Sequence, residues 1–108
     1  YIYSYLYYDP QFVIKFKSAK TLSGVGILSS FTSYGYGVKK VTVETSLDGK
    51  TWTSMGTATA ATQYDDDTTF PIVFSSPVKC QYVRLSNIET YDTGDYPLFA
   101  ISEIGAYE

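Results

Sequence analysis

The sequence of 108 residues contains no histidine. A chain without an imidazole has no Ser-His or Cys-His nucleophile pair and no histidine-based metal site. Catalysis by carboxylates would remain open, but no pair of acidic residues stands out as the two convergent carboxylates that glycoside hydrolysis requires. The composition therefore favours a binding or structural module over an enzyme.

Cysteine is nearly as scarce, because Cys80 is the only one in the sequence. A single cysteine excludes an internal disulfide. Residues 78–83 around it have the pattern of a strand, and a reactive thiol would need a base and a positive neighbourhood. We therefore interpret Cys80 as a small packing residue.

The sequence also lacks long apolar runs and an excess of positive charge. No run approaches the ~20 residues of a membrane-spanning helix, so we expect no membrane insertion. With 8 basic and 11 acidic residues the net charge is −3, which leaves no basic stripe for a nucleic acid. Residues 1–8 lack the basic lead and the small cleavage-site residues of a signal peptide. An exported form would carry its leader upstream or would have lost it.

Tyrosine is the residue that the sequence has in excess, with 12 in 108 residues. Tyrosine favours strands. It is also typical of binding surfaces, because a rigid ring with a polar tip gives a large contact area at low entropic cost. A chain of this length is expected to form one domain.

One hairpin is specified locally by residues 46–52. The preceding residues 41–45 alternate apolar with polar or hydroxyl-bearing side chains, which is the period of a half-buried strand. The pair Asp48-Gly49 reaches the positive-φ conformations of a tight turn at little steric cost. We expect an antiparallel hairpin with Trp52 as a large anchor near its base.

The remaining sequence alternates between strand patterns and turn signals, without a long segment of helical period. Residues 1–10 are interpreted as a loop or an irregular strand at the domain edge, and residues 56–69 are long enough for part of them to pair as an edge strand. We predict an all-β fold with about seven or eight short strands in a sandwich or barrel. The other expected strands are residues 11–17, 22–30, 40–45, 51–55, 69–74, 79–86 and 99–107, with a connector at 18–21 and a turn at 75–77.

Five stretches occur in the order of one known family. They are residues 12–16, 22–27, 41–52, 82–85 (Tyr-Val-Arg-Leu) and 101–104 (Ile-Ser-Glu-Ile). In this order the sequence resembles the coagulation factor 5/8 type C (discoidin) domain, and within it the bacterial branch grouped with family 32 carbohydrate-binding modules. The resemblance implies a jelly-roll β-sandwich similar to galactose-binding domains. From this resemblance we expect residues 1–108 to form one domain that lacks the first N-terminal segment of the family.

The resemblance also implies a function. Family members bind sugars, glycans or phospholipids through loops at one end of the sandwich, and bacterial members are appended to secreted or surface glycan-processing proteins. We therefore expect a noncatalytic carbohydrate-binding module with an extracellular, cell-surface or periplasmic location, a glycan as ligand and neighbouring domains as partners. The alternative is a structural or protein-interaction β-sandwich domain with no sugar site.

Two loops rich in tyrosine, residues 31–37 and 87–98, supply the candidate ligand-binding residues. If the loops meet at one end, their rings could pack on the C–H faces of sugars, while Asp92, Asp95 and Asn87 take the hydroxyls. Loop packing or an oligomer contact is the alternative role, and Phe99 is open to a place in the core. The predicted ligand-binding residues are Tyr34, Tyr36, Tyr91, Asp95 and Tyr96. Sugar-binding relatives often place an arginine and an asparagine around the first of these loops, and many use a histidine. This sequence has neither an arginine nor an asparagine in that loop and contains no histidine.

Four further positions receive an expected role from the sequence. Glu103 matches a glutamate that lies beside a structural calcium in some members of the family, although the segment that commonly completes that site is not in this sequence. A calcium ion is therefore possible in the complete domain, no cofactor is required, and a hydrogen-bonded or salt-bridged Glu103 is the alternative. The acidic run 65–67 lacks the spacing of a calcium loop and is interpreted as a solvated edge loop. Arg84 is expected to pair with a carboxylate, and the glycines at 24 and 26 indicate close backbone approach or a bulge.

Overall fold

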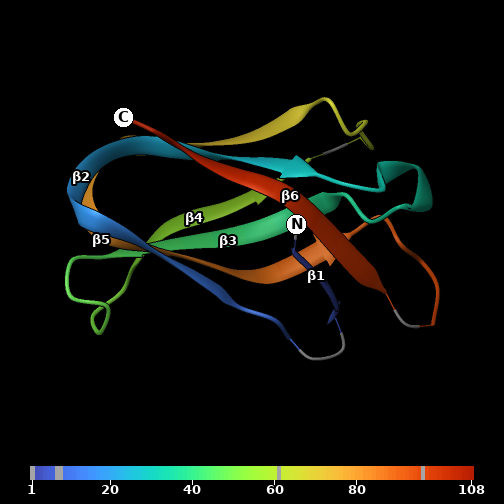
Figure 1. Ribbon diagram of the computed structural model, residues 1–108, viewed down its shortest axis with the longest axis horizontal. Helices are drawn as coiled ribbons and strands as arrows, with labels where there is room; N and C mark the ends of the chain where they lie inside the picture. Colours follow the sequence, from blue (N-terminus) through green and yellow to red (C-terminus); the bar gives the residue numbers. More distant parts are fainter. Residues whose placement is uncertain (1, 7–8, 61, 96) are drawn as a thin grey trace.

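The computed structural model describes residues 2–6, 9–60, 62–95 and 97–108, and these residues form one six-stranded antiparallel sheet (Figure 1). Five pairings give the strand order β1-β6-β2-β5-β3-β4. The strands are β1 (Ile2–Tyr5), β2 (Phe12–Ser29), β3 (Val38–Ser46), β4 (Thr53–Thr59), β5 (Thr69–Thr90) and β6 (Leu98–Tyr107), and a 3₁₀ turn, η2 (Thr32–Tyr34), lies between β2 and β3.

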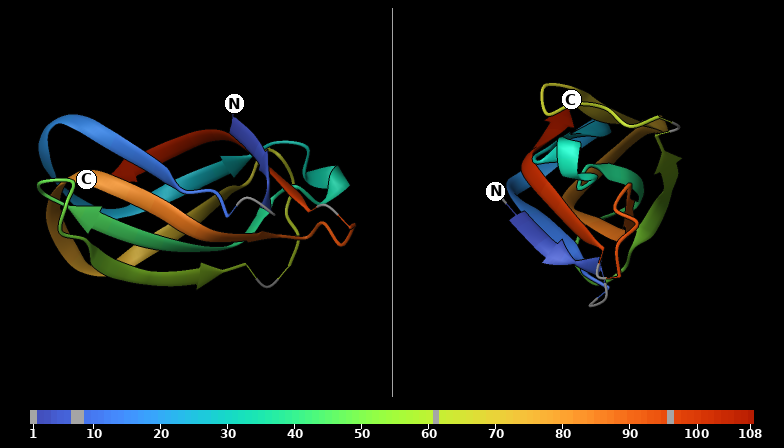
Figure 2. Two further views of the ribbon diagram at one scale, coloured as in Figure 1. Left: turned by 90° about the horizontal axis from the view of Figure 1, so that it is seen from below. Right: turned by 90° about the vertical axis from the view of Figure 1, so that its right-hand side faces the viewer.

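Two long strands fold this single sheet over on itself. The first part of β2 pairs with the second part of β5, and the second part of β2 pairs with the first part of β5 on one side and with β6 on the other. Register shifts between Lys15 and Lys20 and between Leu22 and Gly24 bend β2 where it passes between the layers. Figure 2 shows the curled sheet end-on, enclosing the interior. The expectation of an all-β sandwich is therefore confirmed.

The predicted breaks within these two strands are wrong. Residues 18–21 and 75–77, expected as a connector and a turn, are continuous parts of β2 and β5. A bulge lets a strand change direction while its other residues stay in the ladder, so polar and small residues at the bend do not end the strand. Four predicted strands thus become two long ones. Residues 2–5, expected as a loop or an irregular strand, form the edge strand β1 beside β6.

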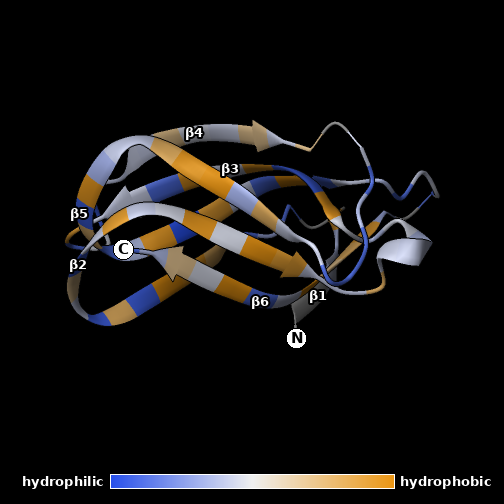
Figure 3. Ribbon diagram, turned by 90° about the horizontal axis from the view of Figure 1, so that it is seen from above, coloured by the Kyte–Doolittle hydropathy of each residue, from blue (hydrophilic) through white to orange (hydrophobic). Residues whose placement is uncertain are grey.

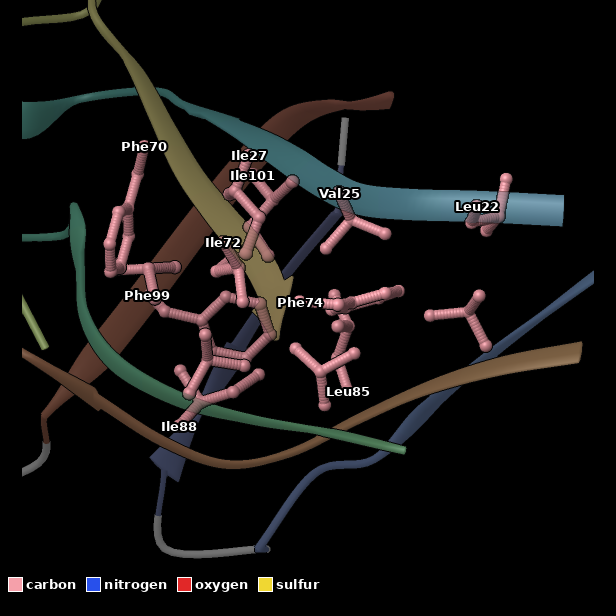
Figure 4. Packing of buried hydrophobic residues seen from close by; sticks show 14 of the residues in the cluster. Leu22, Val25, Ile27, Phe70, Ile72, Phe74, Leu85, Ile88, Phe99 and Ile101 are labelled. Atoms are coloured by element: carbon pink, nitrogen blue, oxygen red, sulfur yellow. The ribbon is translucent and has the colours of Figure 1, made fainter. Parts of the chain in front are cut away.

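The core lies between the two layers and is built from alternate residues of the strands. Figure 4 shows aromatic and aliphatic side chains of β2, β5 and β6 pointing into one interior, and Figure 3 shows the matching alternation of hydropathy along the strands. Phe99 is fully buried and its ring meets Phe12 edge-on at 5.4 Å. The other large members are Leu22, Val25, Ile27, Val41, Val43, Phe70, Ile72, Phe74, Val83, Leu85, Ile88 and Ile101. Cys80 is buried as well, as expected for a packing residue.

The predicted hairpin is confirmed between β3 and β4. A carboxylate oxygen of Asp48 accepts hydrogen bonds from the backbone N–H groups of Lys50 (2.8 Å) and Thr51 (2.9 Å), and Gly49 has a φ of 76°. β4 extends to residue 59, so part of the long segment 56–69 does pair as an edge strand.

Trp52 anchors this hairpin on the outside of the sheet. The centroid of its ring lies 4.2 Å from the guanidinium carbon of Arg84. Arg84 forms a bidentate ion pair with Glu44, with Nε donating to Oε1 at 3.0 Å and Nη2 donating to Oε2 at 2.9 Å. The expected pairing of Arg84 with a carboxylate is therefore confirmed. These hydrogen bonds and the charge of Arg84 lower the pKa of Glu44.

Candidate functional site

Three connections meet at the pole of the sandwich opposite the β3–β4 hairpin (Figure 1). They are residues 30–37 after β2, residues 60 and 62–68 after β4 and residues 91–95 and 97 after β5. Gly35 lies against the backbone of Tyr91 and Asp92 so closely that a Cβ atom there would be 3.1 Å from both, and its φ is 85°. The backbone carbonyl of Tyr36 accepts a hydrogen bond from the N–H of Ala100 at 3.1 Å. The expectation that the two tyrosine-bearing connections reach the same rim is confirmed.

The first connection carries a row of three aromatic rings, Phe31, Tyr34 and Tyr36, which we call the aromatic shelf. The ring centroids of Phe31 and Tyr34 are 6.3 Å apart, and those of Tyr34 and Tyr36 are 5.8 Å apart with a tilt of only 31°. Tyr34 is 69% exposed and Tyr36 is half-buried. The two neighbouring rings give an aromatic surface with two hydroxyl groups, and Tyr34 is its exposed part.

The shelf depends on the short turn η2 between two left-handed residues. Phe31 precedes the turn with a φ of 54°, and Gly35 follows it. The N–H of Tyr34 donates to the carbonyl of Phe31 at 3.0 Å, and that of Gly35 donates to the carbonyl of Thr32 at 2.9 Å. A left-handed phenylalanine is unusual and requires support from the surrounding structure.

That support comes from the acidic run. One carboxylate oxygen of Asp66 accepts hydrogen bonds from both the backbone N–H (2.9 Å) and the hydroxyl (2.5 Å) of Thr32, which is buried. Gln63 adds a side-chain hydrogen bond to the carbonyl of Thr32 at 2.5 Å. The bonds from Thr32 lower the pKa of the Asp66 carboxyl, because they favour its charged form. The acidic run is exposed, as expected, but the sequence did not reveal that it holds the shelf.

Tyr64 connects the loop that contains the acidic run to the first residue of β3. The N–H of Val38 donates to Ser29 Oγ (3.2 Å), Ser29 Oγ lies 3.1 Å from Tyr64 Oη, and Tyr64 Oη donates to the carbonyl of Val38 (2.6 Å). This closed ring of hydrogen bonds satisfies polar groups of two fully buried residues, Ser29 and Val38. Burial is the main cause of the raised pKa of Tyr64.

Tyr91 lies at the rim, but its hydroxyl is hydrogen-bonded to the backbone of the connection after β4. Its hydroxyl donates to the carbonyls of Ala60 (2.6 Å) and Thr62 (2.9 Å), and its ring meets Tyr64 edge-on at 6.4 Å. Burial raises its pKa. The structure therefore gives Tyr91 a role in loop packing, which was the alternative to ligand contact, and its part in binding stays a prediction.

The predicted polar partners are distributed unevenly. Asp92 accepts hydrogen bonds from the N–H groups of Gly94 and Leu98, so it shapes the loop. Asp95 is exposed, and its carboxylate has no partner among the residues that the structure describes. Tyr96 lies outside the described residues. Asn87 is exposed and donates to Thr42 Oγ1 at 3.3 Å, which places it over β3 and away from the shelf.

Glu103, the candidate calcium ligand, lies exposed on β6 beside Leu28 of β2. Within the described part of the chain, no three acidic, histidine or cysteine side chains gather into a possible metal site. Calcium takes six to eight oxygen ligands, so the residues around Glu103 do not form a calcium site by themselves. Calcium in a longer form of the domain stays a prediction.

No helix in the described ranges is long and apolar enough to cross a membrane.

The chain is similar to known proteins in both sequence pattern and fold. The family model for the F5/8 type C domain matches residues 5–101. No curated protein matches the chain. Three similar solved structures come from Clostridium perfringens. The module CBM32-1 of a family 31 glycoside hydrolase is 22% identical with a TM-score of 0.72, and 93% of this chain covers 70% of it.

The other two structures contain sugars. The family 32 carbohydrate-binding module of NanJ, in complex with galactose, is 15% identical with a TM-score of 0.68, and 91% of this chain covers 66% of it. The module CpGH89CBM32-5, in complex with GalNAc-β-1,3-galactose, is 14% identical with a TM-score of 0.70, and 91% of this chain covers 65% of it. The chain thus spans about two thirds of the length of these structures, and such identities show a shared fold only. The match of the family model to residues 5–101 shows that the chain belongs to the F5/8 type C domain family.

Proposed function

We propose that this domain is a noncatalytic glycan-binding module whose ligand stacks on the aromatic shelf. The observation that carries the proposal is the exposed ring of Tyr34, held beside Tyr36 by a hydrogen-bonded turn at the rim of the sandwich. Sugar rings present flat C–H faces, and a rigid aromatic surface can pack against them at low entropic cost. Membership of the family and the sugars bound by two structural relatives support the same function.

Charge and polarity restrict the ligand class. The shelf itself carries no charged side chain, and Asp95 on the neighbouring loop is an exposed hydrogen-bond acceptor. The net charge of −3 disfavours an acidic polymer as the ligand. We therefore propose a neutral glycan bound through Tyr34 and Tyr36, with Tyr91, Asp95 and Tyr96 as the predicted remainder of the site.

The setting of the domain is part of the proposal. One of the relatives is a module of a glycoside hydrolase. By analogy we propose that this domain is joined to neighbouring domains of an extracellular, cell-surface or periplasmic glycan-processing protein. It would then hold a catalytic domain near its polymer, since a tethered weak binder raises the local concentration of its partner.

A glycan array followed by calorimetry tests the function. The wild-type domain is expected to bind galactose- or hexosamine-containing glycans, and Tyr34→Ala is expected to bind them much more weakly because the contact with the shelf is lost. Leu47→Ala is the matched control, because Leu47 is also an exposed loop residue but lies in the β3–β4 hairpin at the other pole. Equal binding by Tyr34→Ala and wild type, or no binding to any glycan, would overturn the proposal.

The alternative function is a protein-interaction domain without a sugar site. One observation favours it. The hydroxyl of Tyr91 and the carboxylate of Asp92, two of the candidate contacts, form hydrogen bonds with the backbone of the loops instead of being free for a ligand. An exposed Phe31 beside Tyr34 would then serve as an apolar docking surface. Loss of binding to a neighbouring domain in Tyr34→Ala, with no glycan bound by the wild type, would select this function.

A further inference from the structure

The outer face of the layer formed by β2, the first part of β5 and β6 has a strip without side chains. Gly26 of β2 lies directly beside Gly105 of β6 in the ladder, and Gly24 lies beside Tyr107. Because alternate residues of a strand share a face, Gly24 and Gly26 mark one line along this surface. Neither glycine has a positive φ, so backbone conformation does not explain them.

Close contacts explain why these positions are glycine. A Cβ atom on Gly26 would lie 2.5 Å from Tyr107 Oη and 2.9 Å from Thr69 Cγ2, whereas a Cβ atom on Gly24 would lie 2.4 Å from the backbone carbonyl oxygen of Ile72 and 3.2 Å from Tyr107 Cδ2. The tyrosine ring therefore extends along the backbone of β2 and rests directly on it. The ring still leaves 38% of the residue exposed. An aromatic ring fixed against a backbone in this way is a rigid platform on an otherwise flat sheet.

A polar end lies next to the platform. Leu28 is flanked in the ladder by Glu103 on β6 and by Thr69 on β5. Together with Gly26, Gly105 and Tyr107, these three residues line an open groove with a volume of about 200 Å³. Glu103 and Tyr107 line the same groove, and the Glu103 carboxylate has no ion-pair or hydrogen-bond partner among the described residues. Structural pairing, expected as one role for Glu103, is thus not what the structure shows.

We propose that this groove is a second saccharide-binding site, separate from the aromatic shelf. One sugar ring would lie on Tyr107, while the Glu103 carboxylate accepts hydrogen bonds from adjacent ring hydroxyls and Thr69 Oγ1 adds a donor or an acceptor. The free carboxylate and the overall negative charge favour a neutral or amino sugar over an acidic one. The groove is smaller than the roughly 300–1,000 Å³ of typical ligand pockets, so it suits a single sugar unit of a longer chain.

The proposal gives the domain two contacts with one glycan. Each contact alone would be weak, because an open site buries little of the sugar. A polymer that reaches both the groove and the shelf would bind more tightly than either site predicts, since the second contact forms within the first complex. The groove does not depend on the shelf being a sugar site, because the two share no residue.

Amide chemical-shift titration of the ¹⁵N-labelled domain tests the second site separately from the first. The probes are galactose, GalNAc-β-1,3-galactose and N-acetylglucosamine. We expect the amides of Gly26, Glu103 and Gly105 to shift with at least one probe, and to shift equally in the Tyr34→Ala variant. Shifts confined to Tyr34 and Gly35 would overturn the second site and leave the proposed function intact. Shifts confined to Gly26, Glu103 and Gly105 would support the second site and overturn the proposed binding at the shelf.

Variants identify the side chains that act in the groove. Glu103→Gln keeps the shape but loses the charge, and we expect affinity at the groove to fall roughly tenfold, because hydrogen bonds to charged groups are the stronger ones. Tyr107→Ala is expected to abolish the groove shifts. Val73→Ala is the matched control, since Val73 lies in the same cross-strand row as Tyr107, is 74% exposed and does not line the groove. Unchanged groove affinity in Glu103→Gln would contradict the proposal, even if Tyr107→Ala failed to fold.

Discussion

Replacing Tyr64 by phenylalanine tests the inference that the rim is held by buried hydrogen bonds. The variant keeps the ring and its contacts with Phe70 and Tyr91, and it removes only the hydroxyl. That hydroxyl donates to the carbonyl of Val38 at 2.6 Å and lies 3.1 Å from Ser29 Oγ. Val38 and Ser29 are 0% and 1% exposed, so water replaces the lost partner poorly.

The magnitude follows from the cost of leaving a buried polar group short of a partner. Such a loss costs about 1–3 kcal/mol, and we expect the free energy of unfolding to fall by about 2 kcal/mol. For a domain of this size each kcal/mol moves the midpoint of thermal unfolding by roughly 4 °C, so a decrease of about 8 °C is expected. Urea denaturation followed by circular dichroism measures the free energy directly.

Tyr82→Phe is the matched control for this prediction. Tyr82 is also half-buried and its ring contacts Trp52, but its hydroxyl has no hydrogen-bond partner among the described residues. Its loss is expected to change stability by less than about 0.5 kcal/mol, as at ordinary surface positions. If the two variants have the same stability, the hydrogen-bonded ring around Tyr64 does not hold the rim and the reasoning is refuted.

Four further predictions concern the shelf, the core and the dependence on pH. Gly35→Ala places a Cβ in a left-handed residue 3.1 Å from the neighbouring loop, so we expect a loss of at least about 1 kcal/mol in urea denaturation, and wild-type stability would contradict the contact. Phe99→Ala empties the centre of the core and is expected to cost about 3–5 kcal/mol, whereas Val73→Ala is expected to cost almost nothing. The lowered pKa of Asp66 means that its contribution is present above the ordinary value of 3.8 and is lost as the pH falls below it. Amide exchange at Tyr34 and Gly35 should therefore accelerate below about pH 4, relative to global stability, in the wild type but not in Asp66→Asn; parallel curves would exclude this role. The pKa of Tyr64 is raised, so the domain is expected to lose stability as the pH rises above 10, the ordinary pKa of tyrosine. In alkaline denaturation, Tyr64→Phe should show a smaller loss of stability over this pH range than the wild type.

Local features of the fold were predictable from the sequence, because their causes lie within a few residues. The pair Asp48-Gly49 specifies the β3–β4 hairpin by its own turn chemistry. Alternation of apolar residues located most strands, since one face of each strand is buried. Gly24 indicated a close backbone approach, which the carbonyl oxygen of Ile72 makes, and at Gly26 the nearest atom is Tyr107 Oη. The bends of β2 and β5 were missed, because a bulge is selected by the layers that the strand joins.

The site was predictable only as a region. Tyr34 and Tyr91 have similar surroundings in the sequence, and what separates them is the pair of carbonyls, of Ala60 and Thr62, that only one of them reaches. The contact between Asp66 and Thr32 joins residues 34 positions apart, and no local pattern marks it. Long-range hydrogen bonds therefore decide which tyrosines support the rim and which face the solvent.

The most direct test of the central claim is calorimetry of two substitutions at Tyr34 with GalNAc-β-1,3-galactose, the disaccharide held by one structural relative. If the ligand stacks on the shelf, Tyr34→Phe retains binding within a few-fold of the wild type because it keeps the ring, and Tyr34→Ala binds much more weakly because the shelf contact is lost. Equal affinities for Tyr34→Ala and the wild type, or an absence of binding by the wild type to this sugar and to every glycan of the array, would contradict the account.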